Sequence, residues 1–128
     1  MNGTLPSVQV SGDAGVSWSS WTLSQQAVGI IPHPDYIFFC SDLSSDTGIY
    51  RASVSDTGVA AVTSATPVRV LNPVTDLGLA TQASFGVGWE GFVDSFGYIV
   101  IPRAAVSVTG VAARLLVSPD DGRTWRTF

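Results

Sequence analysis

Short segments rich in Val, Ile, Phe and Tyr follow one another along almost the whole chain, and they constrain the fold more than any other feature. Gly, Pro, Asp, Asn and Ser, which favour turns, bound each segment. No window of about ten residues combines helical apolar spacing with helix-forming polar residues. The pattern therefore predicts an all-β fold of antiparallel strands. The segments are SVQV, AVGII, YIFFC, GIYRASV, GVAAV, TPVRVL, ASFGVGW, FGYIVIP, AAVSV and ARLLVS.

Length and charge narrow the classes of protein that fit. The 128 residues favour one all-β domain spanning 1–128. The net charge is −4, and all six basic residues are arginines, so we expect no broad basic patch and no nucleic-acid partner. No apolar run approaches the roughly 18 residues of a membrane span, which predicts no membrane insertion. The opening MNGTLPSVQV shows no signal-peptide pattern.

Two turns of the same pattern lie at opposite ends of the chain, SGDAGVSW at 11–18 and SPDDGRTW at 118–125. An Asp carboxylate can accept hydrogen bonds from the backbone of its own turn, and Gly supplies a positive φ. Ser or Thr hydroxyls can satisfy loop groups, and the Trp can fill the space under a hairpin. The pattern predicts two rigid structural hairpins. Its matched positions are Ser11, Asp13, Gly15, Ser17 and Trp18, and Ser118, Asp120, Gly122, Thr124 and Trp125.

This Ser-x-Asp-x-Gly-x-Ser/Thr-Trp pattern resembles the Asp-box, or BNR repeat, of sialidases and other β-propellers. The resemblance implies that each box joins the third and fourth strands of a propeller blade. A degenerate box with Ser55, Asp56 and Gly58, but no Trp, lies in the middle of the chain. The resemblance thus implies about two and a half blades. They are a half blade at 6–23, a blade at 27–66 and an enlarged blade at 67–128, with NPVTD at 72–76 as the internal boundary.

A closed propeller needs at least about four blades, so one chain cannot close the ring. We therefore expect partners that are copies of the chain, or other subunits of an assembly. A β-sandwich that carries Asp-box hairpins is the alternative fold, and a third possibility is that the chain is part of a longer polypeptide.

Candidate catalytic groups are sparse, and we expect no enzyme. A sialidase would need an arginine triad, but Ile101 stands where an arginine should precede Pro102. Asp-Thr-Gly occurs at 46–48 and at 56–58, which resembles the aspartic-protease signature, yet two hairpin turns explain both better. His33 and Cys40 are the only residues of their types. We therefore expect no metal and no cofactor.

An aromatic, glycine-rich stretch at 86–98 is the remaining candidate site. Its residues could pack in the core, stack on a sugar ring or anchor a partner subunit. The favoured function is a non-catalytic structural subunit of an extracellular or virion-type assembly. A carbohydrate-binding, lectin-like module is the alternative, and a fragment of a sialidase-like glycosidase is the second. The candidate binding residues are Trp89, Glu90, Phe92, Asp94 and Tyr98.

Overall fold

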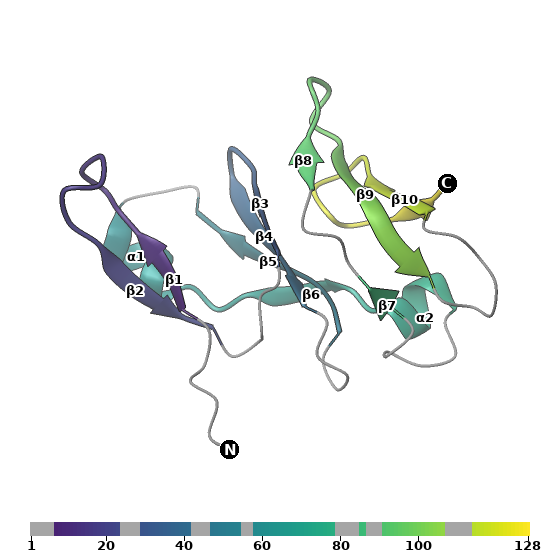
Figure 1. Ribbon diagram of the computed structural model, residues 1–128, viewed down its shortest axis with the longest axis horizontal. Helices are drawn as coiled ribbons and strands as arrows, with labels where there is room; N and C mark the ends of the chain where they lie inside the picture. Colours follow the sequence, from purple (N-terminus) through teal and green to yellow (C-terminus); the bar gives the residue numbers. More distant parts are fainter. Residues whose placement is uncertain are drawn as a thin grey trace, which may run out of the picture.

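In the part of the chain that it describes, the computed structural model contains three antiparallel β-sheets and two short helices (Figure 1). The prediction of an all-β fold of antiparallel strands is confirmed. The structure describes residues 7–23, 29–41, 47–54, 58–78, 85–86, 91–106 and 114–128. For residues 85–86, 103–106 and 114 it describes the backbone only.

The three sheets follow one another along the chain. The N-terminal sheet pairs β1 (Ser7–Val10) with β2 (Ser19–Thr22). The central sheet has the order β3-β4-β5-β6. In the C-terminal sheet, β11, β10 and β9 are neighbours, and β7 and β8 both pair with β9. The bounds are β3 (Gly29–Pro32), β4 (Tyr36–Ser41), β5 (Gly48–Ser53), β6 (Val68–Leu71), β7 (Phe85–Gly86), β8 (Phe92–Val93), β9 (Ile99–Val106), β10 (Arg114–Ser118) and β11 (Arg126–Thr127).

The central sheet lies between the other two (Figure 1), and its middle strands β4 and β5 are buried on both faces. Successive residues of a strand point to opposite faces, so Phe38 and Cys40 face the C-terminal sheet while Phe39 faces the N-terminal one. This explains why YIFFC reads as a continuous apolar run and not as an alternation.

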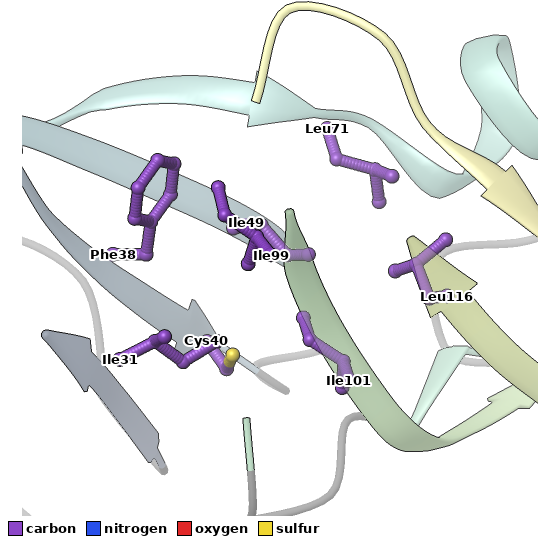
Figure 2. Close-up of a cluster of buried hydrophobic side chains, with 8 residues drawn as sticks. All are labelled: Ile31, Phe38, Cys40, Ile49, Leu71, Ile99, Ile101 and Leu116. Carbon is purple, nitrogen blue, oxygen red and sulfur yellow. The ribbon is translucent and has the colours of Figure 1, made fainter. Parts of the chain in front are cut away.

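The core between the central and C-terminal sheets is the larger of the two clusters of buried side chains. β4 and β5 contribute Phe38 and Ile49, which meet Ile99 and Ile101 of β9 and Leu116 of β10 (Figure 2). All of these side chains are buried almost completely. Burial of each contributes about 1.5–3 kcal/mol, so this cluster joins the two sheets firmly.

The second core joins the N-terminal sheet to the opposite face of the central sheet. Trp21 packs edge-on against Phe39, with ring centroids 5.1 Å apart, and Tyr50 lies in the same cluster. The Trp21 indole N–H donates to the carbonyl oxygen of Ala65 at 3.0 Å. Trp21 therefore anchors the N-terminal hairpin.

The segment GVAAV was predicted as a strand, and this was wrong. It forms most of helix α1 (Val59–Ser64), which connects β5 to β6. Its alanines favour helix, and Val62 turns toward the second core. The Ser64 hydroxyl donates to the carbonyl oxygen of Ala60 at 2.8 Å.

The fourth strand of the central sheet is instead β6, which pairs with β5. The central sheet thus reaches Leu71, beyond the expected division at 66/67. In the degenerate middle box, Ser55 and Asp56 lie outside the described residues, and Gly58 precedes α1 with a φ of 94°.

Helix α2 (Pro73–Leu77) leads from the central sheet to the C-terminal sheet, at the segment expected as an internal boundary. The Asn72 side chain accepts from the Val74 N–H at 3.0 Å, and the Asp76 carboxylate accepts from the Asn72 N–H at 2.7 Å. This reciprocal capping, with Pro73 in the first turn and Gly78 in the left-handed conformation at the end, explains a helix of only five residues.

Candidate functional site

The N-terminal turn (Ser11–Trp18) closes its hydrogen bonds within itself. Asp13 accepts from the Ser17 N–H at 2.8 Å with one carboxylate oxygen and from the Ser17 hydroxyl at 2.6 Å with the other. The Ser11 hydroxyl donates to Asp13 at 2.9 Å and accepts from the Gly15 N–H at 2.8 Å. The Trp18 indole N–H donates to the Gly15 carbonyl oxygen at 3.1 Å.

The C-terminal turn (Ser118–Trp125) repeats this network bond for bond. Asp120 accepts from the Thr124 N–H at 2.7 Å and from the Thr124 hydroxyl at 2.6 Å. The Ser118 hydroxyl donates to Asp120 at 3.1 Å and accepts from the Gly122 N–H at 2.8 Å. The Trp125 indole N–H donates to the Gly122 carbonyl oxygen at 3.1 Å. The ten turn residues selected from the sequence thus act together within each turn.

Both aspartates are held in their charged form. Hydrogen bonds from the side chain and backbone of Ser17 lower the pKa of Asp13. For Asp120, burial raises the pKa, but the hydrogen bonds from Thr124 and Ser118 and the charge of Arg123 outweigh it, so the pKa lies below its ordinary value. The carboxylates therefore serve as acceptors within the turns and are poorly suited to donate protons in catalysis.

The C-terminal turn is docked on the central sheet. The Trp125 indole N–H also donates to the Val70 carbonyl oxygen at 3.2 Å. The Arg51 guanidinium donates to the Asp121 carbonyl oxygen at 2.7 Å, and His33 lies 3.2 Å from the Asp121 carboxylate. Gly122 packs so closely that a Cβ there would lie 2.8 Å from the Phe38 ring.

The N-terminal turn has the same internal geometry, but its tip faces solvent. Trp18 is 60% exposed and Val16 is 85% exposed. Among the described residues, a Cβ at Gly15 would meet only the turn's own Trp18, at 3.5 Å. At its start the turn meets helix α1, since a Cβ at Gly12 would lie 2.8 Å from the Val59 side chain. The pattern of residues is the same in both turns, so sequence reasoning could not tell which of them docks on a sheet.

The aromatic stretch forms a second rigid turn, between β8 and β9. The Asp94 carboxylate accepts from the N–H groups of Phe96 at 2.9 Å and Tyr98 at 2.8 Å, so it stabilises the turn. Phe96, which sequence analysis did not select, is 83% exposed, and its ring centroid lies 6.2 Å from that of Tyr98. Trp89 and Glu90 lie outside the described residues.

A row of paired residues, apolar except for Arg126 at its end, crosses the outer face of the C-terminal sheet, the face opposite the core. Phe92 of β8 is paired with Val100 of β9, Val100 with Val117 of β10, and Val117 with Arg126 of β11. Phe92 is 50% exposed, and Phe128, whose backbone pairs with that of Leu115 on β10, is 68% exposed.

We call this surface the outer face, and sequence analysis missed it. A signal was present: IVI in β9 and LLV in β10 are apolar at consecutive positions, like YIFFC in the doubly buried central sheet.

The other candidates offer no chemistry in the described part of the chain. No group of three or more His, Cys, Asp or Glu could hold a metal ion there. Burial raises the pKa of the Cys40 thiol to about 12, so it is inert. Of the Asp-Thr-Gly segments, Thr47 is buried directly before strand β5 and Gly48 begins that strand, and Asp46, Asp56 and Thr57 lie outside the described residues. Neither described helix has the length and hydropathy of a membrane-spanning segment.

No family model, curated protein sequence or solved structure matches this chain. Its function must therefore be inferred from the geometry of the turns and sheets.

Proposed function

We propose that this protein is a non-catalytic structural subunit that assembles with copies of itself. The observation that carries the proposal is the outer face. The central sheet packs against a neighbouring core on each face and leaves only Ile30 and Val68 of its large apolar residues exposed, on its two edge strands. The C-terminal sheet, in contrast, leaves Phe92 and Phe128 exposed on one of its faces. Exposed apolar patches on a rigid sheet are typical of interaction surfaces.

The repeated architecture supports the same proposal. Two sheets of at least four strands and one two-stranded hairpin stack face to face, each joined to the next by an apolar core. We interpret them as about two and a half propeller-like blades, with the two turns as Asp-boxes. An incomplete set of blades has open outer surfaces, which neighbouring subunits would cover. An extracellular or virion-type setting remains part of this proposal.

The oligomeric state of the full chain tests this function. We expect light scattering coupled to size exclusion to give a multimer, and we expect Phe92→Ser or Phe128→Ser to weaken it. Val68→Ser is the matched control, because Val68 is an exposed apolar strand residue, on the edge strand of the central sheet. A chain that stays monomeric at all accessible concentrations would contradict the proposal.

A carbohydrate-binding module is the second candidate. The exposed Phe96 and Tyr98 rings, held on a turn that Asp94 stabilises, offer a rigid platform for a sugar ring. Glycan-array binding that is lost in Phe96→Ala or Trp89→Ala, with the unfolding midpoint unchanged, would favour it. Binding that is absent from the unmodified chain would dismiss it.

A further inference from the structure

We propose that the outer face of the C-terminal sheet binds the N-terminal turn of a second copy, so that subunits join head to tail. This inference rests on the proposed self-assembly and names the two surfaces that make the contact. One turn is docked on a sheet within the chain; the other has the same geometry, packs against Val59 of α1 through Gly12, and leaves Val16 and Trp18 exposed. One sheet face is uncovered. The contacts of the docked C-terminal turn with the central sheet show which residues of a sheet a turn of this pattern meets.

Strand register identifies the position on the C-terminal sheet that corresponds to the docking site. In the β3–β4 hairpin, Pro32–Ile37 is the last pair before the turn, and Ile31–Phe38 is the pair next to it. In the β8–β9 hairpin, Val93–Ile99 is the last pair before the turn, and Phe92–Val100 is the pair next to it. Phe38, which Gly122 contacts, therefore corresponds to Val100.

The next strand extends the correspondence. Phe38 pairs with Arg51 on β5, and Val100 pairs with Val117 on β10. Phe38 points from the central sheet toward the C-terminal sheet, whereas Val100, between the buried Ile99 and Ile101, points away from the central sheet. The two sites thus lie on the same side of successive sheets. A further hairpin on the outer face would continue the stack in the same direction.

The chemistry of the two turns differs in the way that the two sites differ. The docked turn presents Asp121, whose carbonyl oxygen and carboxylate meet Arg51 and His33. The N-terminal turn has Ala14 in place of Asp121, with the same left-handed backbone, at φ values of 55° and 58°. The outer face has Val117 in place of Arg51. A polar turn meets a polar site within the chain, and an apolar turn matches an apolar site between chains.

Two further positions agree with this match. Val16 of the N-terminal turn stands where the docked turn has Arg123, which makes its tip more apolar. Trp18 stands where Trp125 donates to the backbone of β6, and its ring is available to cover apolar side chains. The contact joins two different surfaces, so it is heterologous and produces a closed ring or an open filament.

A charge introduced at Ala14 tests the proposal, and its rescue tests the assigned site. Ala14→Asp would desolvate a carboxylate against Val117, a cost that the exposed Arg126 on the neighbouring strand does not fully offset. We expect it to weaken self-association at least about tenfold. Ala14→Asp with Val117→Arg would place a guanidinium opposite the new carboxylate, as His33 stands opposite the Asp121 carboxylate within the chain. We expect this double variant to recover most of the association. Ala60→Asp, on the exposed side of α1, is the control and should assemble like the unmodified chain.

Cysteine cross-linking tests the direction of the contact. A mixture of Ala14→Cys and Val117→Cys subunits should form cross-linked dimers, whereas neither variant alone should cross-link, because like residues do not meet in a head-to-tail contact. Cys40 is buried and does not interfere.

The results separate the two proposals. A multimer that Ala14→Asp leaves intact, or one that Val117→Arg fails to rescue, would overturn this interface while the structural function stands. A monomeric unmodified chain would overturn both.

Discussion

Asp120 and Asp13 accept equivalent hydrogen bonds in the two turns, but only the turn of Asp120 is docked on a sheet. Replacing either aspartate with alanine leaves the donors of its turn unpaired. We expect Asp120→Ala to lower the free energy of unfolding by about 1–3 kcal/mol, because one of its donors, the Ser118 hydroxyl, is buried. Asp13→Ala should cost less, because solvent reaches that turn. Urea unfolding of the two variants measures the difference, and equal losses would contradict this reasoning.

The same two carboxylates make stability depend on pH. Their pKa values are lower in the folded chain than in the unfolded chain. Their contribution is therefore present above the unfolded pKa, near 4, and is lost as the pH falls through the folded pKa. We expect the urea midpoint to fall below about pH 4. In Asp13→Asn/Asp120→Asn the fall should be smaller, and an unchanged pH profile in this double variant would contradict the role of the two aspartates.

At the scale of elements, contact between the C-terminal turn and the central sheet should make Gly122 far less tolerant than Gly15. Both have a positive φ, 82° and 88°, so alanine strains the backbone equally at each. Only at Gly122 would the new Cβ collide with Phe38. We expect Gly122→Ala to destabilise the protein by about 1–3 kcal/mol more than Gly15→Ala. Thermal unfolding of the two variants compares them. Similar midpoints would contradict the prediction, because they would mean that Phe38 moves away to make room for the new Cβ.

Sequence patterns predicted the elements better than their contacts. Short apolar runs between turn residues correctly indicated strands, and spacing brought together the ten residues of the two turns. GVAAV was misread because five apolar residues fit a buried strand and a short helix equally well. The docking of Trp125 but not Trp18 could not be predicted, because it depends on which sheet lies beside each turn.

At the scale of the whole molecule, the central sheet is the element on which the other two depend. The contacts that pass from one outer sheet to the other run through the adjacent side chains Phe38 and Phe39, which point to opposite cores. The stack of sheets therefore consists of two interfaces that share one sheet. The interface between the central and C-terminal sheets, with its docked turn, is the counterpart of the contact proposed between subunits, so assembly would extend the packing that already holds these two sheets together.

This arrangement predicts that the two interfaces can be loosened separately. Phe39→Leu removes ring contacts with Trp21 and should speed amide hydrogen exchange mainly in β1 and β2. Phe38→Leu should act mainly on β9 and β10, whose Ile99, Ile101 and Leu116 share its core. Hydrogen exchange read strand by strand compares the variants, and each serves as the control for the other. If both variants accelerated exchange equally in all three sheets, the chain would open as one cooperative unit, and the central sheet would not separate two independent cores.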